Sequence, residues 1–193
     1  MNLDWQVIVD NQWTYSLISA LLGALFTFVF MFLWNKRGIF TWENHVERLA
    51  ISGSAQVFGE VEIYWEGSEK ENLFLSTIEL KNESTNDYED VDFTVWVSEE
   101  IELLQGASWI KGTSEIVNYT KEFQNLENRL SSGNSTETDL DTYKKKREFN
   151  VSVFNRDQSV IVQLLITTTK APNNIETPFV FLDLLHKGVD LKR

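Results

Sequence analysis

The chain has 193 residues with no cysteine, 42% hydrophobic and 24% charged residues, and a formal charge of −12. This composition fits a globular domain of ordinary size and excludes collagen-like, disulfide-stapled and wholly disordered chains. The charge is unevenly placed. Residues 1–37 sum to zero, because two aspartates balance Lys36 and Arg37, so residues 38–193 carry the entire −12.

Residues 14–34 form an apolar run without a single charge. A helix of this length spans about 31 Å, which matches a hydrocarbon core of roughly 30 Å. Trp13, Tyr15 and Trp34 stand at its ends, where amphipathic rings favour the headgroup region. The preceding segment is acidic and lacks the positive start of a signal peptide. We therefore predict an outer tail over 1–13 and an uncleaved transmembrane helix over 14–34.

The charges that flank this run predict its orientation. Asp4 and Asp10 precede it, whereas Lys36 and Arg37 follow it. By the positive-inside rule, the C-terminal part then lies in the cytoplasm, and the protein is a single-pass protein of the cell inner membrane. The absence of cysteine is compatible with either side of the membrane.

Small residues recur inside the run at spacings of four, three and four: Ser16, Ala20, Gly23 and Thr27. Such spacing places them on one stripe of a helix, where a second helix approaches closely. The stripe predicts a homo-oligomer. The alternative is that small residues are simply common in membrane helices.

Beyond Gly38 the apolar period changes from helical to two, as half-buried strands require. Alternation predicts strands around 57–63, 74–80, 91–98 and 149–153. Residues 158–169 are apolar on both faces, which predicts a central strand covered on both sides. Short strands without intervening crossover helices favour an antiparallel β-sandwich or a β-barrel, which we expect over 51–193.

Four stretches depart from this alternation. Residues 35–50 form a juxtamembrane segment that is either a spacer or the first strand. Residues 99–104 and 121–130 are each compatible with a short helix. Residues 131–142 are polar and acidic, which predicts a mobile loop.

Two stretches read as strand, turn and strand: LFLSTIELKNESTNDYEDVDFTVWV over 73–97 and FNVSVFNRDQSVIVQLLI over 149–166. Both resemble hairpins of bacterial immunoglobulin-like sandwiches. The resemblance implies an immunoglobulin-like β-sandwich on a single-pass membrane segment, and it carries over no functional residue.

Signatures of catalysis and of metal binding are absent from the sequence. His45 and His186 do not have metal-ligand spacing, and neither a GxGxxG nor a Walker-type motif is present. His186, Asp183 and Ser159 would be the members of a triad, but no nucleophile elbow surrounds Ser159. We expect no enzyme, no metal site and no cofactor.

The acidic charge opposes binding to DNA or RNA duplexes. One basic cluster departs from this background: Lys144, Lys145, Lys146 and Arg147. It either protects a strand edge or binds an anion, such as a cyclic nucleotide or an acidic protein partner. If the strand extends back from Phe149, Lys145 and Arg147 share one face, and reversing both charges should leave folding nearly intact.

The layout of membrane helix, β domain and basic cluster resembles that of bacterial antiviral membrane effectors of the CRISPR or CBASS type. The resemblance implies an oligomeric sensor whose cytoplasmic domain binds a nucleotide second messenger and acts on the lipid bilayer. The alternative is a non-enzymatic, membrane-anchored protein-docking or assembly module.

Overall fold

The computed structural model describes residues 12–34, 38–51, 53–55, 59–70, 72–168, 177–184 and 186–193. The chain divides into two compact units, Met1–Arg37 and Gly38–Arg193. Most of the predicted outer tail, the flanking residues Lys36 and Arg37, and Val57 lie outside the described residues.

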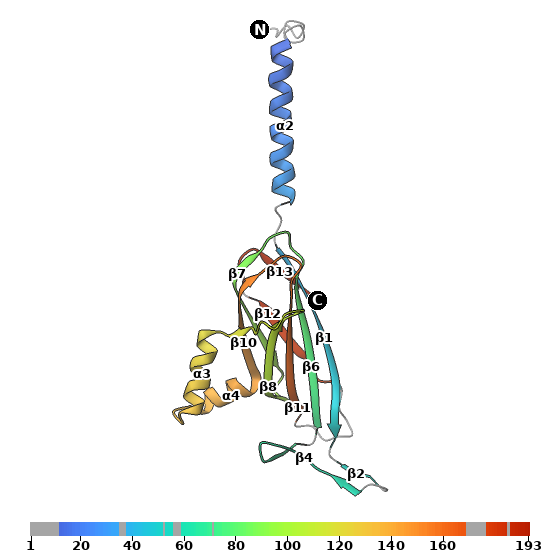
Figure 1. The fold of residues 1–193 in the computed structure, drawn as a ribbon, viewed down its shortest axis with the longest axis vertical. Helices are drawn as coiled ribbons and strands as arrows, with labels where there is room; N and C mark the ends of the chain where they lie inside the picture. The colour runs from blue at the N-terminus through green and yellow to red at the C-terminus, as the bar shows by residue number, and fades with distance from the viewer. Residues whose placement is uncertain are drawn as a thin grey trace. The chain divides into compact units, whose positions relative to one another are not determined.

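The described part of the first unit is the helix α2 (Gln12–Trp34), drawn in blue in Figure 1. Its run of leucine, alanine and phenylalanine lacks proline and charge, and side chains from Tyr15 to Met31 are exposed. The stretch Trp13–Met31 is long and apolar enough to cross a membrane. An exposed apolar helix near the N-terminus serves as a membrane anchor or as a signal sequence.

The described part of the second unit is mainly β. Its elements are β1 (Gly38–Ile51), β2 (Gly53–Ala55), β3 (Gly59–Val61), β4 (Ile63–Trp65), β5 (Ser68–Lys70), β6 (Asn72–Asn82), β7 (Tyr88–Val97), β8 (Ile101–Ile110), β9 (Asn118–Tyr119), α3 (Lys121–Ser131), α4 (Glu137–Lys145), β10 (Lys146–Phe154), β11 (Ser159–Thr168), β12 (Val180–Leu184) and β13 (Val189–Lys192).

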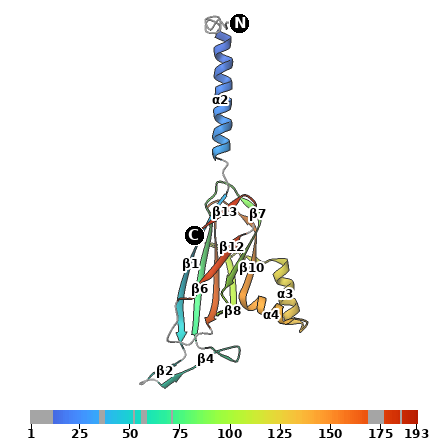
Figure 2. The same ribbon diagram turned by 180° about the vertical axis from the view of Figure 1, so that it is seen from behind.

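Two main sheets organise these strands. One has the order β13-β1-β6-β11-β8 and is mixed, because β13 runs parallel to β1 while the other neighbours are antiparallel. The other has the order β12-β7-β10-β9 and is antiparallel. Among the described strands the sheets stay separate, so they do not close into a barrel (Figures 1 and 2).

The core lies where the inward faces of the two sheets meet. On β6, Phe74, Ser76, Ile78 and Leu80 are buried, as the alternation predicts. The inward residues of β7 and β10 belong to the same hydrophobic cluster as those of β6 and β11. The strands predicted at 74–80, 91–98 and 149–153 are therefore confirmed.

Strand pairing resolves two of the four irregular stretches. Residues 38–50 belong to strand β1, which pairs with β6, so the β unit begins at Gly38 rather than at 51. The prediction of a helix at 99–104 is wrong. Ile101 and Leu103 pair with β11 and bury their side chains, which overrides the helix propensity of the neighbouring glutamates and leucine.

The helix predicted at 121–130 is confirmed as α3, which begins after the N-cap Thr120. Residues 131–142, expected to be a loop, contain the first turns of α4. A capping box forms at the start of α4, where Thr136 and Asp139 each accept a backbone N–H of the other. The central strand predicted at 158–169 is β11, which has one fully buried face and one half-buried face.

Candidate functional site

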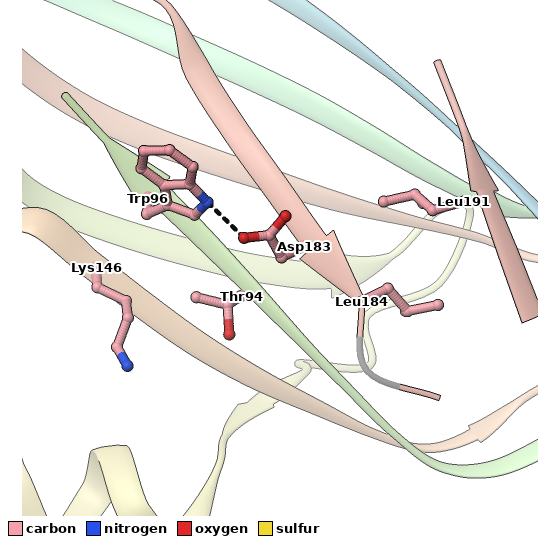
Figure 3. Close-up of a pocket in the computed structure, with 6 residues that line it drawn as sticks. All are labelled: Thr94, Trp96, Lys146, Asp183, Leu184 and Leu191. Atoms are coloured by element: carbon pink, nitrogen blue, oxygen red, sulfur yellow. Dashed lines mark hydrogen bonds between the residues drawn. The ribbon is translucent and has the colours of Figure 1, made fainter. Parts of the chain in front are cut away.

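An open groove of about 600 Å³ lies on the outer face of the four-stranded sheet. It extends to β13, an edge strand of the five-stranded sheet. Figure 3 shows the six side chains that line it: Thr94, Trp96, Lys146, Asp183, Leu184 and Leu191. The volume falls in the range of sites that bind small molecules or peptide side chains.

Strand alternation and register place the polar side chains of this groove. Val95 and Val97 point into the core, so Thr94 and Trp96 of β7 point outward. Thr94 pairs with Asp183 of β12, and Trp96 pairs with Lys146 of β10. Three strands therefore bring an indole, a hydroxyl, an ammonium and a carboxylate onto one face.

The indole of Trp96 is held in place from two directions. Its Nε1–H donates to the Asp183 carboxylate at 2.7 Å, the bond drawn dashed in Figure 3. Its ring stacks on Phe181 with centroids 4.1 Å apart and an angle of 13° between the planes. Because Phe181 does not line the groove, its packing supports the indole from outside the site.

The groove contains charges of both signs. Lys146 forms an ion pair with Glu148 at 2.5 Å, and Asp183 accepts the Trp96 N–H. Figure 3 shows Thr94 between Lys146 and Asp183. A site with this balance favours neither a free anion nor a free cation, but suits a group that carries donors and acceptors together.

The apolar end of the groove is formed by Leu184 and Leu191, which are partly buried and pack against the core. They come from β12 and β13, which stand at the ends of the two sheets. The groove thus joins an outer sheet face to the margin where the two sheets end.

The predicted basic cluster is split between secondary-structure elements. Lys144 and Lys145 end α4, where cations interact favourably with the helix dipole. Lys144 forms an ion pair with Glu102 at 3.3 Å. Lys145 donates from Nζ to the carbonyl oxygens of Glu99 at 2.6 Å and Ile101 at 2.7 Å.

Arg147 is fully buried, with a relative exposure of 0%. Its guanidinium carbon lies 4.0 Å from the ring centroid of Tyr143 and 5.4 Å from that of Phe123. The guanidinium donates to the carbonyl oxygens of Tyr143 and of Lys146. Burial lowers the pKa of Arg147 from its usual value, because removal from water disfavours the charged form.

The prediction that Lys145 and Arg147 share one strand face is wrong, because Lys145 belongs to α4 and only Arg147 lies on β10. All four cations contact groups of the same chain. Whether they also hold a nucleotide or another anion stays a prediction.

Glu102 connects three parts of the β unit. Its carboxylate forms ion pairs with Lys70 of β5 and Lys144 of α4, both at 3.3 Å. Burial acts to raise the pKa of Glu102, but hydrogen bonds from Lys144 and Lys70 outweigh it, so the pKa is lowered. The terminal strand of the β4–β5 hairpin, the edge strand β8 and α4 are therefore tied together by one carboxylate.

The stripe of small residues lies on the exposed surface of α2. Thr27 donates its hydroxyl to the backbone oxygen of Gly23 at 2.8 Å, so this polar group is satisfied within the helix. A Cβ at Gly23 would meet no atom within 4 Å in the single chain.

The residues of the rejected triad have separate partners. Asp183 accepts from Trp96, the Ser159 hydroxyl helps to lower the pKa of the Glu79 carboxyl, and the His186 ring packs edge-on against Tyr88 at 5.3 Å. His45 lies beside Glu47 at 3.1 Å on the exposed surface. Among the described residues, no group of three or more His, Asp or Glu is placed to hold a metal ion.

No family model matches this chain, and no curated protein matches it in sequence. Among solved structures it is similar to AvmM, which catalyses macrocyclization in alchivemycin A biosynthesis. The identity is 8% and the TM-score 0.27, over 63% of this chain and 78% of that chain. At this TM-score the likeness carries no argument about activity.

The alternation of β7 already directs Thr94 and Trp96 outward, so these two of the six lining residues are predictable from the sequence. Asp183, by contrast, follows Trp96 by 87 residues. No local pattern brings these two residues together, and only the pairing of β12 with β7 does so.

Proposed function

We propose that this chain is a single-pass membrane protein whose cytoplasmic β domain is a non-enzymatic docking module. The observation that carries the proposal is the groove lined by Trp96, Thr94 and two charges of opposite sign. Its indole is prepositioned by Phe181 and Asp183, which lowers the ordering cost when a partner binds. Tryptophan is also among the residues most often found at the centre of interfaces.

We assign the β domain to the immunoglobulin-like class on strand order. The neighbours β1-β6-β11-β8 follow the order A-B-E-D of such domains, and β7 beside β12 corresponds to C beside F. The domain departs from that scheme in β13, which joins β1 rather than β12, and in β10, which follows β8 and pairs with β7. Domains of this class commonly bind and assemble.

The membrane part of the proposal is supported by the exposed apolar helix α2 and by the sequence that flanks it. The residues that precede the helix include Asp4 and Asp10 but no Lys or Arg, which favours an anchor over a signal sequence. Lys36 and Arg37 follow the helix, which favours a cytoplasmic β domain. A reporter enzyme that works only in the cytoplasm should therefore be active when fused after Arg193. A reporter that works only in the periplasm should be inactive at the same position.

Docking ranks above sensing of an antiviral nucleotide messenger because of where the cations point. Lys145 and Arg147 donate to backbone carbonyls, and Lys144 and Lys146 pair with glutamates. A phosphate would have to displace these contacts. No observation in the described residues favours nucleotide binding over docking.

Photocrosslinking in cells tests the docking function. A photoreactive amino acid at Thr94, inside the groove, should yield a discrete crosslinked species. The matched control is Ile116, which is 72% exposed and lies outside the groove. Identical crosslinking at both positions, or none at Thr94, would contradict the proposal.

The homo-oligomer is tested separately by Gly23→Ile. Because nothing lies within 4 Å of a Cβ there, the variant helix should fold normally as a single chain. Added bulk should hinder only a second helix that packs on the stripe. We expect a smaller oligomer fraction by sedimentation in detergent, and an unchanged profile would mean that this stripe does not drive assembly.

A further inference from the structure

The two lateral sides of the β domain differ in how their strand edges are protected. On one side, α4 contacts the edge strand β8, and Ile116 forms an antiparallel β-bridge with Trp109 of that strand. Near the start of β8, the Lys145 ammonium donates hydrogen bonds to the carbonyl oxygens of Glu99 and Ile101. In the other sheet, β9 has only two residues and leads directly into α3. Short and covered edges of this kind resist pairing with other chains.

The opposite side has two open edges within the described residues. There β12 pairs only with β7, and β13 pairs only with β1. Alternate backbone N–H and C=O groups of an edge strand point away from its neighbour and are free to pair. The groove runs along this side, because Asp183 and Leu184 come from β12 and Leu191 comes from β13.

We propose that the groove binds an extended polypeptide segment of a partner protein, which adds as a strand to the free edge of β12. This inference rests on the docking function proposed above and names its partner class. In strand addition, main-chain hydrogen bonds supply affinity and alternate side chains supply specificity. One set of side chains of the segment lies over Leu184 and Leu191, and the other set lies over the polar part of the groove.

The chemistry of the lining defines the segment. Leu184 and Leu191 select an aliphatic side chain. Thr94 offers a hydroxyl between the Lys146 ammonium and the Asp183 carboxylate, which suits an uncharged polar side chain. Residues 38–193 carry a net charge of −12, so a segment with net negative charge is repelled on approach. The expected segment is extended, alternately aliphatic and polar, and neutral or basic.

The Asp183 carboxylate does not protect this edge as edge charges commonly do. It lies on the outer face of the sheet and is held there by the Trp96 indole at 2.7 Å. It therefore borders the groove rather than the free edge of β12.

The experiment uses the full-length protein in lipid nanodiscs and a phage-displayed library of random ten-residue peptides. The most enriched peptide is synthesised together with two derivatives. One derivative is N-methylated at the odd-numbered residues and the other at the even-numbered residues, which gives the two possible phases. Only one phase carries the N–H groups that face β12. We expect that phase to lose affinity about 10- to 30-fold by fluorescence anisotropy, since two or more hydrogen bonds are removed, and the other phase to keep it.

A pair of chain variants locates the binding. Leu191→Lys places a charge in the groove and should weaken the peptide about 10-fold or more. Leu140→Lys makes the same change on α4, at a side chain that is 46% exposed, and should leave affinity unchanged. Circular dichroism checks both folds. If Leu191→Lys fails to fold, the two N-methylation phases decide alone.

The outcomes separate this inference from the docking function. Equal losses in both phases, or enrichment of no peptide, overturn strand addition. The crosslinking experiment at Thr94 then decides separately whether the groove docks a partner. Loss of binding in one phase only, combined with sensitivity to Leu191→Lys, supports strand addition at β12.

Discussion

The side of the β domain covered by α3 and α4 and the open side at β12 and β13 differ in how they engage two adjacent cations, Arg147 and Lys146. Arg147 is buried with its guanidinium against Tyr143 and Phe123, the aromatic residues of α4 and α3. Lys146 points outward and lines the groove. Because successive side chains of a strand point to opposite faces, one run of cations contributes to both sides. A run of charge in a sequence is therefore not a patch of charge on the surface.

The largest effect is expected where the covered side depends on the buried cation. Arg147→Glu places a buried carboxylate among aromatic rings and backbone oxygens, near the Glu127 carboxylate, and should cost about 4 kcal/mol or more of unfolding free energy. This corrects the expectation that charge reversal leaves folding intact, because that expectation assumed exposure. Urea unfolding followed by tryptophan fluorescence measures the loss.

Arg147→Met is the matched control. It keeps most of the buried volume and removes the desolvated charge, so its cost should stay within about 1.5 kcal/mol. Equal costs for the Glu and Met variants would show that packing volume, rather than charge, dominates this position.

Local patterns account for the parts of the fold that depend on local physics. The strands at 74–80 and 91–98 and the helix at 121–130 were predicted from the sequence because short-range periodicity decides them. At 99–104 the local preference for helix lost to pairing with β11, a partner some 65 residues away.

The candidate site was less accessible from the sequence than the strands were. Trp96 faces outward by alternation, but its contact with Asp183 depends on strand order. The four cations were visible as a run, yet burial of Arg147 depends on α3 and α4 covering that margin of the sheet. Long-range pairing carries information that no short window contains.

A smaller effect is expected from Lys145, the second cation of the covered side. Its ammonium donates to the carbonyl oxygens of Glu99 and Ile101, so Lys145→Met leaves two acceptors without this donor. We expect a loss of about 1–2 kcal/mol in the same unfolding measurement. Lys187, exposed on the turn before β13, supplies the control for removal of one positive charge. A similar loss from Lys187→Met would point to net charge as the cause.

Glu102→Gln should cost about 1 kcal/mol at neutral pH, since the amide cannot form ion pairs with Lys70 and Lys144. The pKa of Glu102 is lowered in the folded chain, so its stabilisation is present above the unfolded-state pKa of about 4.3. It is lost as the pH falls through the lower folded-state pKa. The difference in stability between wild type and variant should therefore shrink from pH 7 toward pH 3. A difference independent of pH would assign the cost to packing.

The smallest change in stability is expected on the open side, from Asp183→Asn. The amide oxygen can still accept the Trp96 Nε1–H, and Asp183 is exposed, so unfolding should shift by about 0.5 kcal/mol or less. The groove, however, loses the negative charge that balances Lys146 beside Thr94. Binding of an enriched peptide should then become more favourable for acidic than for basic side chains at the polar positions, which anisotropy with two peptide variants measures. If the covered side stabilises the fold while the open side selects a partner, Asp183→Asn changes the peptide preference and Lys145→Met does not. A large loss of stability from Asp183→Asn would instead make the Trp96–Asp183 contact a structural element of the sheet.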